Sequence, residues 1–92
     1  MICVKMDGSR LTVRGHAGYG KPGEDVVCAA ASALVYALIG TLRQKDRIRE
    51  LTIRPGYVDV AAAGDAEEAM AVVRCGLEQL ASQYGAWVKM EE

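Results

Sequence analysis

Apolar and polar residues alternate in two short segments near the N-terminus, at residues 2–6 and 11–16. Alternation places successive side chains on opposite faces of a strand, so each segment predicts a half-buried β-strand. Asp7-Gly8 lies between them and is a typical tight-turn signal, which predicts a β-hairpin. His16 falls at the end of the second predicted strand, on the face opposite to its apolar residues.

The longest apolar segment follows a glycine-rich loop at residues 17–24. Asp25 is a suitable N-cap residue, and apolar residues recur after it at spacings of three and four. This spacing predicts a helix from about Val26 to Arg43. A similar spacing later in the chain predicts a second helix, which opens at Gly64-Asp65 and stops at Gly85.

Three further strands complete the predicted fold. Residues 49–54 and 57–61 have strand character and flank a Pro55-Gly56 turn, and residues 86–90 form a last short strand. The element order is ββαββαβ, and no long linker interrupts it. The sequence therefore predicts one α+β domain over residues 1–92, a sandwich of about five strands and two helices.

Charge and hydropathy exclude several classes of partner. The formal net charge of −1 gives no global attraction to nucleic acid, so no direct nucleic-acid binding is expected. The N-terminal segment is too short and too alternating for a signal peptide. The apolar segment from Val26 to Gly40 is shorter than the ~20 residues of a membrane span. We therefore expect a soluble, cytoplasmic protein with no membrane partner.

Candidate chemistry is limited by a small set of reactive side chains. The chain has one histidine, His16, and three cysteines: Cys3, Cys28 and Cys75. An odd number of cysteines without paired spacing argues against a disulfide framework, and the lone histidine argues against a zinc site. No metal and no cofactor are expected.

His16 and Cys28 are twelve residues apart and flank the glycine-rich loop. A cysteine nucleophile needs a thiolate that attacks and an imidazole that takes and returns a proton. With Asp25 as the N-cap, Cys28 is the third helical residue, where free backbone N–H groups stabilise a thiolate and can form an oxyanion hole. The simpler interpretation is that Cys28 is a small apolar residue of a buried helix and His16 a surface residue.

Two further residues are candidates for supporting roles. Asp25 either caps the helix or turns toward Nδ1 of His16 and fixes its tautomer. Ser32 lies one helical turn after Cys28, where its hydroxyl either donates a hydrogen bond near the site or bonds back to the Cys28 carbonyl.

The loop also contains a literal match to the dinucleotide-binding pattern G-x-G-x-x-G, at residues 18–23. The chain is too short for a doubly wound nucleotide fold, and Glu24 and Asp25 place negative charge where a pyrophosphate would lie. A loop that opens for a peptide and closes over it is the better interpretation. Its candidate residues are Gly18, Tyr19, Gly20 and Gly23.

Gly15-His16-Ala17, followed by the G-x-D-V-V-C-A-A-x-S pattern of residues 23–32, resembles the ribosomal-processing cysteine protease family, Prp. The resemblance covers essentially the whole chain in length and element order. It implies a single cysteine protease domain with a dyad of His16 and Cys28, and with Asp25 and Ser32 as supporting residues. It further implies a homodimer with a mobile loop beside the site. The implied substrate is the N-terminal segment of large-subunit ribosomal protein twenty-seven, from which a short extension would be removed.

Other functions remain open on the residues alone. The main alternative is a non-enzymatic, ribosome-associated interaction module in which Cys28 is structural, and such a thiol would resist alkylation near neutral pH. A small thiol hydrolase acting on esters would prefer thioesters to peptides. A nucleotide-binding protein would be stabilised against heat by its ligand.

Overall fold

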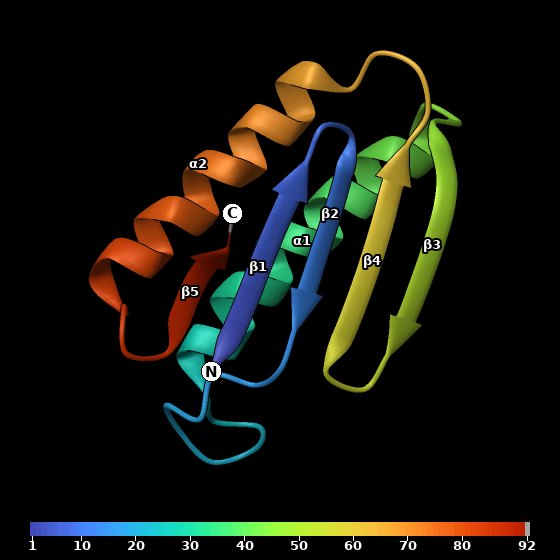
Figure 1. The fold of residues 1–92 in the computed structure, drawn as a ribbon. Coiled ribbons are helices and arrows are strands. Elements are labelled where there is room, and N and C mark those ends of the chain that lie inside the picture. The colour runs from blue at the N-terminus through green and yellow to red at the C-terminus, as the bar shows by residue number, and fades with distance from the viewer. Residues whose placement is uncertain (92) are drawn as a thin grey trace.

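The computed structural model describes residues 1–91, and the chain folds as a five-stranded sheet with two helices on one face (Figure 1). The predicted class and the order ββαββαβ are confirmed. The elements are β1 (Ile2–Asp7), β2 (Arg10–Arg14), α1 (Val26–Gln44), β3 (Ile48–Arg54), β4 (Tyr57–Ala62), α2 (Glu67–Gln83) and β5 (Val88–Glu91).

The strands lie in the order β3-β4-β2-β1-β5. Neighbours pair antiparallel except β1 and β5, which are parallel. Figure 1 shows that the loop from β2 to α1, the β3–β4 turn and the α2–β5 turn all lie at one end of the sheet. The β1–β2 turn lies at the opposite end. Segments distant in sequence therefore meet where His16 and Cys28 are located.

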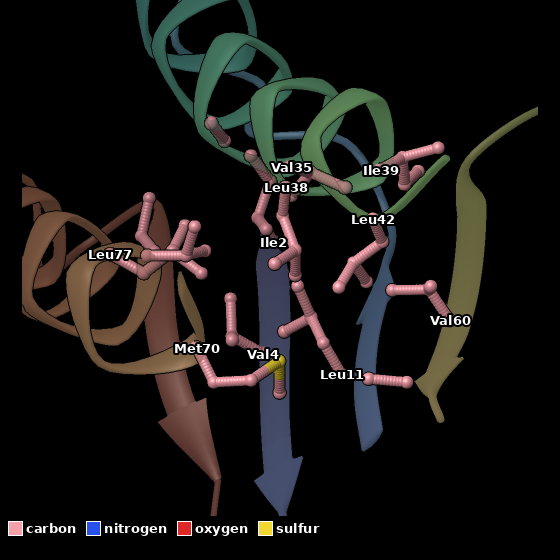
Figure 2. Close-up of a cluster of buried hydrophobic side chains, with 14 of the residues drawn as sticks. Ile2, Val4, Leu11, Val35, Leu38, Ile39, Leu42, Val60, Met70 and Leu77 are labelled. Carbon is pink, nitrogen blue, oxygen red and sulfur yellow. The ribbon is translucent and has the colours of Figure 1, made fainter. Parts of the chain in front are cut away.

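The core lies between the sheet and the two helices (Figure 2). Alternate residues of the central strands point toward one apolar stripe of α1 and one of α2. The largest fully buried side chains are Leu11, Leu38, Leu42, Leu77, Val4, Val27, Val60 and Val88. Each such side chain stabilises the fold by about 1.5–3 kcal/mol relative to exposure.

The opposite face of the sheet carries polar side chains. Asp59 of β4 is buried, and it accepts hydrogen bonds from Arg10 at 2.5 Å and from the Thr12 hydroxyl at 2.9 Å. Arg10 also pairs with Glu50 at 2.6 Å. These bonds satisfy the buried carboxylate.

The second strand ends earlier than predicted, at Arg14 rather than at His16. Gly15 has a φ of +92°, which interrupts the extended backbone, and its N–H donates to the Gly56 carbonyl at 2.8 Å. The last strand begins at Val88 because the N–H groups of Trp87 and Val88 both donate to the Tyr84 carbonyl and close a turn.

Helix α1 also corrects one expectation from the sequence. It is 19 residues long and, by length and composition alone, it is apolar enough to cross a membrane. The helix extends beyond the apolar segment Val26–Gly40, so the short length of that segment does not by itself exclude a membrane span. The core helix of a folded protein passes the same test, and one stripe of α1 is buried against the sheet.

Candidate active site

His16 lies just beyond β2, and the backbone on both sides of it is fixed. The N–H of Gly15 donates to the carbonyl of Gly56, in the turn between β3 and β4. Ala17 is buried, and its N–H donates to the Cys28 sulfur at 3.2 Å. His16 itself is exposed between these two anchors. The histidine segment is thus joined directly to the first turn of α1.

Cys28 is the third residue of α1 and is partly buried. Its sulfur accepts one backbone N–H, and a donor in this place interacts favourably with negative charge on sulfur. The side-chain hydrogen bonds of residues 1–91 include none between the imidazole and the thiol. Catalytic hydrogen bonds are often long before substrate binds, so this geometry is compatible with a working pair.

Asp25 is the N-cap of α1 and ties the helix to the loop. Oδ1 accepts the N–H groups of Val27 and Cys28, each at 3.0 Å. Oδ2 accepts those of Tyr19 at 3.0 Å and Gly20 at 3.1 Å. The carboxylate makes no hydrogen bond to His16 within the described chain, so of its two candidate roles the structure assigns it the helix cap.

These bonds lower the pKa of Asp25 below its ordinary value of about 3.8. The N–H of Cys28 is the largest cause, followed by those of Gly20, Tyr19 and Val27, and partial desolvation opposes them. A carboxylate that accepts several N–H groups is stabilised in its charged form. The cap is therefore ionised at neutral pH.

The same cap overturns one expectation. The N–H groups of Val27 and Cys28 donate to the Asp25 carboxylate, and that of Ala29 donates to the Asp25 carbonyl at 3.0 Å. They are not free to form an oxyanion hole. A helix start provides only a few free donors, and the cap and the hole compete for the same ones.

Two cavities meet at His16, Cys28 and Ser32, which line both of them. The larger is about 720 Å³ and lies under the loop, where Gly18, Gly20, Pro22, Gly23, Asp25 and Ala29 complete its lining. The smaller is about 170 Å³ and lies between α1 and strands β2 and β4. Because Cys28 lines both cavities, the two together offer room for a peptide that continues past the thiol.

Ser32 is exposed and faces both cavities. Among the hydrogen bonds of residues 1–91, none joins its hydroxyl to the Cys28 carbonyl. The hydroxyl is therefore available to a bound molecule.

Tyr19 is placed differently from the loop glycines. Its ring packs edge-on against Tyr84, with centroids 5.4 Å apart, and against Trp87 at 4.9 Å. Gly18, Gly20 and Gly23 line the larger cavity, whereas Tyr19 does not. The loop is thus held at two places, by Asp25 and by the aromatic cluster of Tyr19, Tyr84 and Trp87.

Comparison with known proteins places this arrangement in a family. The profile of the family described as cysteine protease Prp matches residues 1–89. The chain belongs to the cysteine protease Prp family. The predicted family is confirmed, and the family is described as one of cysteine proteases, which are hydrolases.

One relative agrees with this family assignment. The ribosomal processing cysteine protease Prp of Mycoplasma pneumoniae is 38% identical over 39 residues, which are 42% of this chain. The match spans 39% of the length of that relative.

Solved structures show the same fold. The essential ribosomal processing protease Prp of S. aureus, in complex with a covalently linked product peptide, has a TM-score of 0.84 at 17% identity. That match covers 98% of this chain and 95% of the other. SMU.848 from Streptococcus mutans has a TM-score of 0.74 at 22% identity, over 98% of this chain and 90% of the other.

Sequence reasoning missed three contributors to the site. Gly56 was interpreted only as a turn residue, yet it lies against His16. Tyr84 and Trp87 pack against the core and also hold the loop through their edge-on contacts with Tyr19. No local pattern marks these roles, because each depends on a contact between distant parts of the chain.

Proposed function

We propose that this protein is a cysteine endopeptidase in which Cys28 is the nucleophile and His16 the general base and acid. The observation that carries the proposal is the meeting of both residues at the junction of two cavities. The family's description as a cysteine protease supports the same assignment.

The proposed reaction proceeds through a thioester. His16 first takes the proton of the Cys28 thiol. The resulting thiolate attacks the scissile carbonyl, a carbon–sulfur bond forms, and the carbonyl oxygen becomes an oxyanion. His16 gives its proton to the leaving amine as the carbon–nitrogen bond breaks. His16 then takes a proton from water, the hydroxide attacks the thioester, and the peptide acid and the thiol are released. The N–H of Ala17 holds the sulfur in place throughout.

The proposed substrate is the N-terminal segment of large-subunit ribosomal protein twenty-seven. Support comes from the resemblance at residues 15–32 and from the name of the Mycoplasma pneumoniae relative, which describes ribosomal processing. Asp25 takes part by holding the loop and the helix start together. Ser32 is proposed to contact the bound peptide from the cavity wall.

A homodimer is proposed on the resemblance alone, and a cytoplasmic location is proposed on the pattern of the sequence. Light scattering coupled to size-exclusion chromatography tests the first statement, since a dimer doubles the mass of the 9.9 kDa chain. A monomeric mass at working concentration would contradict it.

The test of the function is incubation with a peptide that spans the extension and its junction, followed by mass spectrometry. We expect a single cut by the wild-type protein and none by Cys28→Ala. Cys75→Ala is the matched control, because Cys75 is exposed on α2 and lines neither cavity. Absence of any cut by the wild type, with Cys28 unreactive toward iodoacetamide near neutral pH, would support the non-enzymatic interaction module instead.

A further inference from the structure

The Pro55–Gly56 turn between β3 and β4 lies beside the histidine segment. The Gly56 carbonyl accepts the N–H of Gly15, and Tyr57, the next residue, pairs with Arg14 in the β2–β4 ladder. The turn is therefore held in register with the residues that immediately precede His16. The sheet therefore fixes the position of the turn relative to the backbone that precedes His16.

The imidazole lies where a side chain of residue 56 would be. An ideal Cβ built on Gly56 would lie 2.9 Å from Nε2 of His16 and 3.5 Å from both Cδ2 and Cε1. A carbon at 2.9 Å from a ring atom is closer than van der Waals contact allows. The missing side chain of Gly56 thus leaves the space that His16 uses.

We propose that Gly56 is a positioning residue of the proposed reaction: its lack of a Cβ lets the His16 imidazole lie against the turn, within reach of Cys28. This inference rests on the proposed function, since it concerns the base of that site. Any side chain at position 56 pushes the ring away from the turn. A misplacement of about 1 Å in a catalytic group lowers a rate by about 100-fold.

A second explanation for the glycine is backbone conformation, because Gly56 has a φ of +69°. Gly8 separates the two explanations. It lies in the β1–β2 turn with a φ of +59°, and nothing lies within 4 Å of its Cβ position. That turn is at the other end of the sheet (Figure 1). Gly8→Ala therefore imposes the same backbone strain without touching His16.

The experiment compares Gly56→Ala with Gly8→Ala in urea unfolding and in peptide cleavage. Because both alanines occupy left-handed backbone, we expect each to lower the folded-to-unfolded ratio by about 5- to 30-fold. Only Gly56→Ala should lower kcat, by about 100-fold, with KM little changed. Equal cleavage by the two variants would overturn the proposal.

A double-mutant cycle supplies a readout that does not depend on the peptide. The rate of Cys28 alkylation by iodoacetamide near neutral pH is measured in wild type, Gly56→Ala, His16→Ala and the double variant. We expect Gly56→Ala to slow alkylation in the wild-type background and to have no effect once His16 is alanine. An equal effect in both backgrounds would show that residue 56 does not act through His16.

The outcomes distinguish this inference from the proposed function. If the wild type does not cleave the peptide, the function fails, and the alkylation cycle still decides whether Gly56 positions His16. If Gly56→Ala does not fold, Gly56→Asn replaces it, because asparagine tolerates left-handed backbone yet still has a Cβ. Normal kcat in folded Gly56→Asn would refute the positioning role.

Discussion

The aromatic cluster of Tyr19, Tyr84 and Trp87 makes the loop position measurable, because Trp87 is the only tryptophan of the chain. Tyr19→Ala removes both edge-on contacts of the loop, to Tyr84 and to Trp87. Each such contact contributes about 0.5–1.5 kcal/mol. Tyr19 is 44% exposed, so we take a total near the lower end, about 1–2 kcal/mol. The ratio of docked to released loop should fall by about 5- to 30-fold.

The assay is the fluorescence of Trp87. Tyr19→Ala should shift its emission to longer wavelength and increase its quenching by acrylamide, because water replaces the tyrosine ring. Tyr19→Phe is the control: it keeps both ring contacts and should behave like the wild type. Global unfolding should change little, since Tyr19 is not one of the core residues. Unchanged emission and quenching in Tyr19→Ala would refute the assignment of Tyr19 as the loop anchor.

Two further predictions concern stability. Leu38→Ala should lower the free energy of unfolding by about 3–5 kcal/mol, because Leu38 is only 1% exposed in the core. Ile53 is 45% exposed, so Ile53→Ala should lower the free energy of unfolding much less. Equal losses of the two variants in urea unfolding would contradict the core assignment. Because folding lowers the pKa of Asp25, the ionised carboxylate stabilises the folded state. This stabilisation is fully present above the ordinary pKa of about 3.8 and is lost as pH falls through the lower pKa of the folded state. The stability difference between wild type and Asp25→Asn should therefore shrink in that acidic range, and a difference independent of pH would argue against the ionised cap.

Local patterns predicted the elements well, because periodicity and capping depend on neighbouring residues. Asp25 was a predicted N-cap and is one, and the apolar spacing after it produced the helix that the structure contains. The end of β2 was missed because the β2–β4 pairing, together with the bond from Gly15 to Gly56, determines it.

Contacts between residues far apart in the sequence could not be predicted from local sequence patterns. Tyr19 and Trp87 are far apart in sequence and are in contact in the folded chain, and Gly56 lies against His16 because the β2–β4 ladder brings their segments together. The oxyanion-hole expectation failed for a different reason. It assigned to catalysis the same N–H groups that the predicted cap already used, so the conflict was present in the sequence itself.

The central claim is that Cys28 forms a covalent bond with the peptide, and intact-protein mass spectrometry tests it directly. The protein is mixed with the extension peptide, quenched in acid and weighed, and the modified residue is located by fragmentation. We expect an adduct with the mass of the N-terminal product less one water, attached to Cys28 in wild type and in Cys75→Ala. The adduct should be absent from Cys28→Ala and should form slowly in His16→Ala. Cleavage by Cys28→Ala, or an adduct on any other residue, would contradict the account.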